Sequence, residues 1–188
     1  MKVLHIDSSI MGEASVSRQI SQAIVDQLKT KNSDITIDYL DLAVDSIPHL
    51  TAEILMGQNA EQAALGEKII QQYLDADIVV VGAAMYNFGL PSTLKAWIDR
   101  ISVAGRTFKY SETGPVGLAG DKKVYIASSR GGVYGENSPA DFQENFLKTV
   151  FNFTGVTDVQ ILRAEGVNMG PELKEKAINE VLEKIKQI

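Results

Sequence analysis

Cysteine is absent from this chain of 188 residues. The protein therefore has no disulfide, no thiolate-bound metal or iron–sulfur cluster and no CxxC redox motif. Any redox activity requires an organic cofactor, and we expect no metal site. Histidine is scarce too: His5 falls within an expected strand and is interpreted as a core residue, and His49 follows a proline in a loop.

Basic residues are fewer than acidic residues. The 18 lysines and arginines stand against 24 aspartates and glutamates, a net charge of −6, which argues against a broad nucleic-acid surface. No apolar run reaches the ~18–20 residues of a membrane span, and Met1 leads directly into an expected strand with no apolar leader. We expect a cytoplasmic protein that binds neither nucleic acid nor a membrane.

Hydrophobic residues make up 45% of the chain and charged residues 22%, which is typical of globular proteins. No repeat, low-complexity segment or linker interrupts the sequence, and its length suits one domain of about 150 residues or slightly more. We therefore expect a single domain over residues 1–188.

Branched apolar residues gather in five short runs that predict strands, at residues 3–7, 35–40, 78–83, 123–128 and 159–163. Between them, apolar residues recur at helical spacing; the three patterns are Ile20, Ile24 and Leu28; Leu65, Ile69 and Tyr73; and Leu173, Ala177, Val181 and Ile185. Helices are expected to open at Pro91, Pro139 and Pro171 and to close before Gly105 and Gly155.

Five strand–helix alternations predict an α/β fold, a doubly wound five-stranded parallel sheet with helices on both faces. In such folds ligands lie beyond the carboxyl ends of the strands, near the switch in strand order. Three loops there are unusual, at residues 8–16, 84–90 and 129–137. The irregular residues 106–121 are too long for a routine connection and are expected to form a lid or hairpin over a site.

The first loop carries Ser9, Ser15 and Ser17 and leads into a helix whose free N–H groups favour an anion. Arg18 is the nearby cation. The sequence has neither GxxxxGK[ST], the loop for nucleoside triphosphates, nor GxGxxG, the Rossmann motif for dinucleotides. The ligand that this loop still fits is a phosphate monoester held by hydroxyls and amides. The alternative interpretation is structural: Ser17 caps the helix and the other serines fill the loop.

The second loop places Met85, Tyr86 and Phe88 where connecting loops are ordinarily polar, and the third contains Gly131 and Gly132, which allow close backbone approach to a ligand. The aromatic residues are equally consistent with packing beneath the next helix. Taken together, the loops describe a phosphate end, an apolar wall and an edge of amides, which is the shape of a site for flavin mononucleotide (FMN).

Longer motifs make the sequence recognisable. They are Met85-Tyr86-Asn87-Phe88, Pro91-x-x-Leu94-Lys95-x-x-x-Asp99, Gly105-Arg106-x-Phe108-x-Tyr110-x-x-x-Gly114-Pro115-x-Gly117-Leu118, Ser129-Arg130-Gly131-Gly132, Ala164-Glu165-Gly166 and Gly170-Pro171-Glu172. This pattern closely resembles the bacterial FMN-dependent NADH:quinone oxidoreductases called azoreductases, over the whole chain. One departure is Ala84, where relatives often carry proline.

The resemblance implies a flavodoxin-like fold, a homodimer, and FMN-binding residues that match Ser9, Ser15, Val16, Ser17, Met85, Tyr86, Asn87, Phe88, Ser129, Arg130, Gly131 and Gly132. It also implies hydride transfer from NADH or NADPH to FMN, followed by reduction of a quinone or azo compound at the same place. The backbone amides of Asn87, Gly131 and Gly132 are the candidates to face the flavin ring.

The expected substrate pocket contains Phe88, Tyr110 and Phe153, with Phe151 as an alternative to Phe153. The resemblance implies that the residues of the long loop face the flavin of the partner subunit. No titratable side chain is required, because FMN carries the hydride chemistry.

Two other enzyme or signalling functions are excluded. A serine hydrolase needs a histidine in the carboxyl-terminal half, and a response regulator needs a phosphoacceptor aspartate after the third strand; this sequence has neither. A non-enzymatic flavodoxin-like electron carrier or binding module remains as the alternative; such a carrier has no need of the long segment 106–121, and steady NADH oxidation with a quinone distinguishes it from an enzyme.

Overall fold

The computed structural model describes residues 1–136 and 138–188. Five parallel strands form its main sheet in the order β2-β1-β3-β6-β7. They are β1 (Lys2–Asp7), β2 (Thr36–Asp41), β3 (Ile78–Ala84), β6 (Lys123–Ser129) and β7 (Asp158–Ala164). Each expected strand is confirmed, with ends within one residue of the prediction. The strand order reverses between β1 and β3, which places the switch point beside the ends of these two strands.

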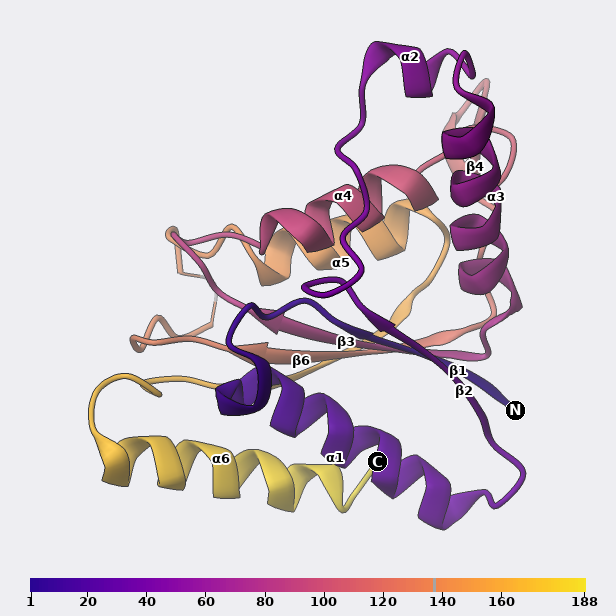
Figure 1. Ribbon diagram of the computed structural model, residues 1–188. Coiled ribbons are helices and arrows are strands. Elements are labelled where there is room, and N and C mark those ends of the chain that lie inside the picture. The colour runs from indigo at the N-terminus through magenta and orange to yellow at the C-terminus, as the bar shows by residue number, and fades with distance from the viewer. Residues whose placement is uncertain (137) are drawn as a thin grey trace.

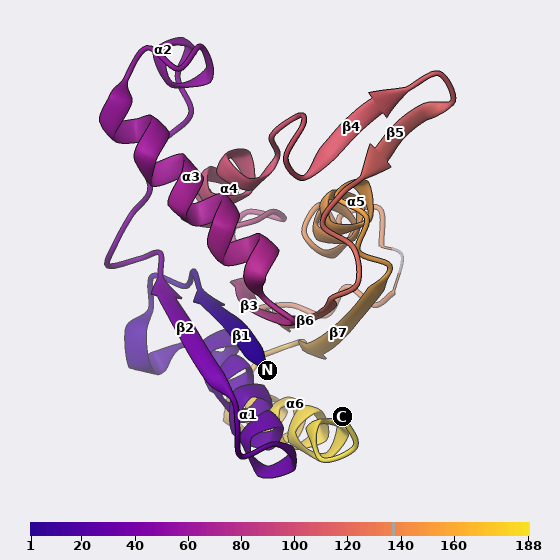
Figure 2. The ribbon, with the colours of Figure 1, turned by 90° about the vertical axis from the view of Figure 1, so that its right-hand side faces the viewer.

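Helices cover both faces of the sheet, as the sequence predicts (Figures 1 and 2). On one face α1 (Val16–Lys31) and α6 (Pro171–Ile185) run side by side, and on the other lie α3 (Ala60–Asp75), α4 (Ser92–Ile101) and α5 (Glu144–Phe153). Two short helices, η1 (Gly12–Ala14) and α2 (Ala52–Leu55), lie within connections. In the part of the chain that the structure describes, no helix is both long and apolar enough to cross a membrane.

Two apolar clusters, one on each face, hold these layers together. Trp97, Tyr73 and Phe151 are fully buried between the sheet and α3, α4 and α5. Ile20 and Ile24 of α1 are fully buried on the opposite face. Fully burying one such side chain contributes about 1.5–3 kcal/mol, so the spacing of apolar residues determines which face of each helix meets the sheet.

The last helix departs from its expected stripe. Val181 and Ile185 are buried as predicted, but Leu173 is exposed and Ile178 is buried in the same stripe. The first turn of α6, which includes Leu173, extends past the carboxyl ends of the strands (Figure 1). The apolar stripe therefore begins one turn later than its spacing suggests.

The sequence also predicts the wrong first residue for α5. Pro139 does not open this helix, which begins at Glu144. The carboxylate of Asp141 accepts hydrogen bonds from the N–H groups of Gln143 and Glu144, at 3.0 and 2.9 Å. This aspartate holds the residues before α5 in a turn and delays the helix.

The long segment 106–121 forms a hairpin of β4 (Phe108–Ser111) and β5 (Gly114–Gly117). At its base, Gly117 crosses the backbone at Gly155, where a Cβ atom would collide with the main chain. The hairpin follows α4, whose last turn lies at the amino edge of the sheet, and so it is far from the carboxyl edge (Figure 1). The expected hairpin is confirmed, but it does not cover the predicted site of its own chain.

Candidate functional site

The first loop leaves β1 at Asp7 and is fixed to β3. The Ser8 hydroxyl donates a 2.6 Å hydrogen bond to the carbonyl of Gly82. Ser15, and not Ser17, caps α1, because the Ser15 hydroxyl accepts the N–H of Arg18 at 3.3 Å. The hydroxyl of Ser17 lies 3.1 Å from that of Ser15. The two serines thus form a pair at the beginning of the helix.

The beginning of α1 retains free donors. Within residues 1–136 and 138–188, the N–H groups of Val16 and Ser17 have no hydrogen-bond partner. Together with the positive end of the helix dipole they favour an anion at this point. The arrangement supports the expectation of a phosphate at residues 15–17.

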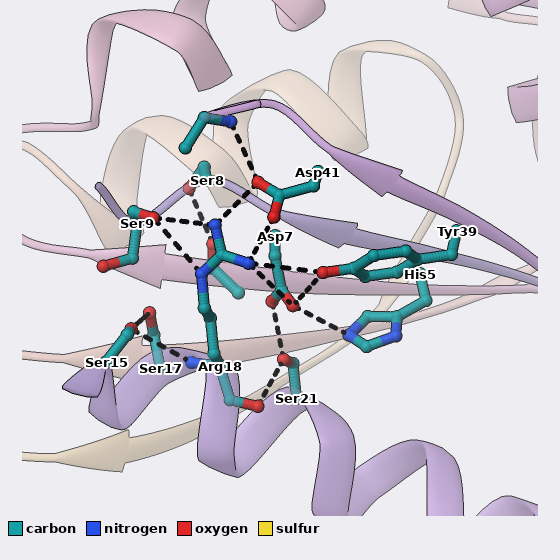
Figure 3. A network of polar contacts seen from close by, with 12 residues as sticks. His5, Asp7, Ser8, Ser9, Ser15, Ser17, Arg18, Ser21, Tyr39 and Asp41 are labelled. Carbon is teal, nitrogen blue, oxygen red and sulfur yellow. Dashed lines mark hydrogen bonds and ion pairs between the residues drawn. The ribbon is translucent and has the colours of Figure 1, made fainter. Parts of the chain in front are cut away.

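Arg18 is not available for that anion, which corrects the expectation from the sequence. Its guanidinium forms a two-pronged ion pair with Asp41, with both N···O distances at 2.6 Å, and it donates to the carbonyl of Ser9 at 2.9 and 3.2 Å (Figure 3). The hydrogen bond from Arg18 lowers the pKa of Asp41. Arg18 therefore holds the loop at Ser9 in place instead of binding a ligand.

A second polar group lies beside this ion pair (Figure 3). The carboxylate of Asp7 accepts hydrogen bonds from Ser21 at 2.7 Å and from the hydroxyl of Tyr39 at 3.1 Å. Burial and then the charge of Asp7 raise the pKa of Tyr39 to about 12, so that its proton stays in this bond. His5 is 3% exposed and packs against Tyr39 with ring centres 4.9 Å apart, as expected of a core histidine.

The second loop contains a tight turn with unusual backbone geometry. Tyr86 and Gly89 exchange hydrogen bonds of 3.1 and 3.0 Å, and the two residues between them, Asn87 and Phe88, have φ of +49° and +68°. This is the pattern of a type I′ turn, which aromatic residues rarely enter because of steric strain. The ring of Phe88 is half exposed. Such strain tends to persist where a site needs it.

The turn is joined to the first loop through Tyr86. Its hydroxyl lies 2.9 Å from that of Ser9 and accepts the N–H of Ile10 at 3.3 Å. Met85 is held to β6 by a 2.8 Å hydrogen bond from its N–H to the carbonyl of Ser129. In the described part of the chain, the N–H groups of Asn87 and Phe88 have no partner. They are open to a ligand, as expected for Asn87.

The third loop keeps its glycine amides free. Among the described residues, the N–H groups of Gly131 and Gly132 make no hydrogen bond, although both carbonyls accept one from residues 166–168. A Cβ atom at Gly131 would lie 2.7 Å from the amide nitrogen of Asn168, so a side chain would push the two loops apart. The predicted loop extends to Asn137, which lies outside the described residues.

The side chain of Arg130 points away from the free amides, into a buried cluster of charges. It is fully buried and pairs with Asp141 at 2.7 Å, Glu144 at 3.0 Å and Glu165 at 3.3 Å. Burial alone would raise the pKa of Asp141, but the hydrogen bond and charge of Arg130 lower it. Arg130 thus fixes the position of the glycine loop, and its guanidinium does not reach the cavity.

One cavity collects residues from all three loops. Its volume is about 330 Å³, within the range of ligand sites. Its lining consists of Ser9, Met11, Ala14, Ser15, Val16, Ala84, Met85, Tyr86, Ser129, Gly131, Val167, Asn168 and Lys174. A second hollow of about 680 Å³ shares Met85 and Tyr86 and extends past Asn87 to Thr93. Of the expected cofactor residues, Ser9, Ser15, Val16, Met85, Tyr86, Asn87, Ser129 and Gly131 line one or both.

Six residues of this lining are not among the expected cofactor residues. Met11, Ala14 and Ala84 lie within the first two loops, and the other three lie outside all three loops. Val167, Asn168 and Lys174 belong to the connection between β7 and α6 and to the first turn of α6. This connection also follows the carboxyl end of a strand, so the rule that located the other three loops applies to it. The motifs Ala164-Glu165-Gly166 and Gly170-Pro171-Glu172 flank this connection, but it carries no glycine pair or aromatic run that would indicate a ligand.

The expected substrate residues are not brought together within one chain. Phe88 lies at the turn after β3, with its ring edge-on to Tyr134. Tyr110 and Phe153 both pack against Phe108, at the opposite edge of the sheet (Figure 1). Tyr110 is 75% exposed and lines a groove of about 530 Å³ between the hairpin, α2, α3 and the end of α4.

The residues that are present fit FMN. Paired serines and free amides lie at the beginning of α1, further free amides lie at the turn after β3 and at the glycine loop, and the ring of Phe88 is half exposed at that turn. These groups match a phosphate, the polar edge of a flavin ring and its apolar face. Ser17, Phe88, Arg130 and Gly132 do not themselves line either cavity. The cavity lining contains no carboxylate among the described residues, so nothing there repels a phosphate.

Known proteins are similar to this chain in sequence and in fold. A family model described as a flavodoxin-like fold matches residues 1–188. An FMN-dependent NADH:quinone oxidoreductase of Stenotrophomonas maltophilia is 55% identical over 178 residues, which cover 95% of this chain and 91% of that protein.

Two solved structures are also similar. An azoreductase from Bacillus anthracis str. Sterne matches with a TM-score of 0.90 and 31% identity, over 100% of this chain and 97% of the other. An FMN-dependent NADH-azoreductase from Bacillus anthracis str. Ames Ancestor in complex with FMN matches with a TM-score of 0.86 and 28% identity, over 99% and 98% of the two chains.

Proposed function

Because the chain belongs to the family of flavodoxin-like proteins whose model spans residues 1–188, we propose that it is an FMN-dependent NADH:quinone oxidoreductase that also reduces azo compounds, as one domain. The observation that carries this proposal is the meeting of three loops with unpaired amides around one cavity at the switch point. The relatives supply the cofactor and the reaction by name.

The chain's own residues would hold FMN in three places. The amides of Val16 and Ser17, with the hydroxyls of Ser9 and of the paired Ser15 and Ser17, would bind the phosphate. The amides of the turn after β3 and of the glycine loop would donate to the flavin ring, where negative charge accumulates on reduction. Ser129 and Arg130 would position that glycine loop by their backbone and ion pairs.

Bound FMN supplies a carrier for two electrons, taken as a hydride from NADH and passed with a proton to a quinone or azo acceptor. The protein contributes position, amide donors and exclusion of water, and no titratable side chain is required. We extend the proposal to NADPH as a possible donor. Since both donors are abundant in the cytoplasm, we place the protein there.

We also propose that the working form is a homodimer. Among the described residues, the ring of Phe88 meets the edge of Tyr134 and is otherwise half exposed, whereas Tyr110 is exposed at the far edge of the sheet beside a mostly apolar groove. A second copy would bring its own Tyr110 and Phe153 to the flavin face of the first. A contiguous exposed apolar surface is typical of such interfaces.

Initial-rate kinetics test the proposed reaction. One aromatic-walled slot beside Phe88 cannot hold two planar substrates at once, so donor and acceptor must react in turn. Rates measured against NADH at several fixed quinone concentrations should then give parallel double-reciprocal lines. Intersecting lines would mean that both substrates bind together, and the single slot would have to be replaced by separate sites.

A further inference from the structure

Arg18, the cation that the sequence suggests for the phosphate, already has an ion-pair partner, but a second cation, Lys174, lines the cavity. Arg18 is bound to Asp41 and to the Ser9 carbonyl. Among the described residues that line the cavity, Lys174 is the one charged side chain. This is unexpected in a chain of net charge −6, and it raises the question of which ligand this lysine serves.

The fold delivers Lys174 to the phosphate end of the site. Helix α6 runs beside α1 on the same face of the sheet, and both helices begin at its carboxyl edge (Figures 1 and 2). Lys174 lies in the first turn of α6, where its N–H bonds the carbonyl of Gly170 at 3.0 Å. Its side chain lines the same cavity as Ser15 and Val16 of the helix beginning opposite.

The backbone beneath Lys174 is held firmly. The N–H groups of Val167 and Asn168 donate to the carbonyls of Arg130 and Gly131, both at 3.1 Å. The connection that precedes α6 is therefore tied to the glycine loop. Lys174 is half-buried, and its ammonium makes no hydrogen bond or ion pair within the described part of the chain. It is free to pair with a ligand.

From these observations we infer that Lys174 pairs with the phosphate monoester of FMN and sets the preference of this protein for FMN over riboflavin. The inference rests on the proposed function. The serines and amides supply hydrogen bonds to a phosphate but no full positive charge, and a phosphate near pH 7 carries between one and two negative charges. A free ammonium at this cavity supplies the missing counter-charge.

The test compares flavin affinities of the full chain after removal of its flavin. Lys174→Gln removes the charge, Lys174→Arg keeps it, and Lys176→Gln is the matched control. Lys176 lies on the same helix, has a side chain that is 72% exposed, and lies 3.9 Å from Glu180. Dissociation constants for FMN and for riboflavin are measured from the quenching of flavin fluorescence, at low and at high salt.

We expect Lys174→Gln to weaken FMN by about tenfold at low salt, a typical loss for one charge-assisted hydrogen bond. Riboflavin affinity should be unchanged, Lys174→Arg should restore most of the FMN affinity, and Lys176→Gln should resemble the wild type. The loss should shrink at high salt, because the ion pair is partly exposed.

Several results would overturn the inference and leave the proposed function intact. The first is that Lys174→Gln binds FMN as tightly as the wild type. A second is an equal loss for FMN and riboflavin, which would place the lysine at the ring or make it structural. A third is unchanged FMN affinity with a raised KM for NADH, which would assign the ammonium to the donor. A wild-type chain that bound neither flavin would instead contradict the proposed function itself.

Discussion

Arg18 and Arg130 both lie beside loops of the proposed FMN site, and both direct their guanidinium groups to carboxylates of the chain. Arg18 pairs with Asp41, which lies 23 positions later, and Arg130 pairs with Asp141 and with Glu165. Sequence alone placed both arginines next to the ligand because it gives no sign of these distant partners. At the scale of single residues, the arginines hold loops and the backbone amides meet the ligand.

Asp41→Asn should therefore destabilise the fold in a way that depends on pH. Its carboxylate has a pKa below the ordinary 3.8 because of Arg18, so its stabilisation is complete above that value and is lost as the pH falls through the lowered pKa. We expect a loss of about 1.5–3 kcal/mol at pH 7. Urea unfolding from pH 7 to pH 3 measures the difference from wild type.

That difference should stay constant down to about pH 4 and close below it. Asp45→Asn provides the control, since this exposed neighbour makes no ion pair within the described residues. A gap between Asp41→Asn and wild type that persisted unchanged at pH 3 would show that the carboxylate stabilises the fold by something other than its charge.

The two serines at the beginning of α1 should separate into different effects. Ser15→Ala removes the N-cap together with one hydroxyl of the phosphate site, and should cost about 1 kcal/mol of stability in addition to FMN affinity. Ser17→Ala leaves the cap in place, and we predict that it weakens FMN by roughly tenfold with little change in riboflavin affinity. Thermal melting and flavin titration of both variants measure the two effects. Equal losses for FMN and riboflavin in Ser17→Ala would show that this hydroxyl supports the helix and does not serve the phosphate.

At the scale of elements, the turn after β3 stores strain that can be measured. Phe88 has φ of +68°, a region where glycine is unstrained and an alanine costs about 1–2 kcal/mol. Phe88→Gly and Phe88→Ala both remove the ring. We predict that the glycine variant is the more stable by about 1 kcal/mol, the reverse of the usual order, and that quinone reduction falls in both.

Chemical unfolding of the two variants, each without flavin, gives the comparison. An alanine variant as stable as the glycine variant would mean that residue 88 relaxes out of the left-handed region when its ring is gone. In that case the strain would come from the packing of the ring against Tyr134 and not from the turn.

The elements themselves were mostly predictable. Runs of branched residues located all five strands of the main sheet. The central strands β1, β3 and β6 are mostly buried between two layers of helices, whereas the edge strands β2 and β7 are mostly half-buried or exposed. Sequence patterns gave wrong element boundaries where a contact with a residue distant in sequence sets the boundary. The turn before α5 is set by Asp141, whose carboxylate also pairs with Arg130, and proline spacing alone could not reveal that. The motifs at the connection before α6 do not include Lys174, and nothing in the local sequence distinguishes this lysine from the others of the same helix.

At the scale of the whole molecule, the proposed homodimer predicts that activity depends on protein concentration. If Tyr110 of one subunit covers the flavin bound to the other, the turnover per bound FMN should fall as the protein is diluted below its dimer dissociation constant. Light scattering coupled to size exclusion gives the oligomeric state at each concentration. Full turnover in a demonstrated monomer would remove the shared pocket and leave the flavin site of the single chain standing.

The same reasoning separates an enzyme from a flavodoxin-like electron carrier. Both would bind FMN at the three loops, but only the enzyme must accept hydride from NADH and pass the electrons to a small acceptor. A carrier has no need of the hairpin of β4 and β5, which lies away from the carboxyl edge of the sheet and so from the site of its own chain (Figure 1).

An anaerobic titration of the FMN-loaded protein with NADH, followed by a soluble quinone, shows whether the chain carries electrons from NADH to a quinone through FMN. We predict one FMN per chain, loss of the oxidised flavin absorption at one NADH per FMN, and full recovery on addition of one equivalent of quinone. A chain that binds no flavin, or that binds FMN without bleaching on addition of NADH, would contradict the proposed function.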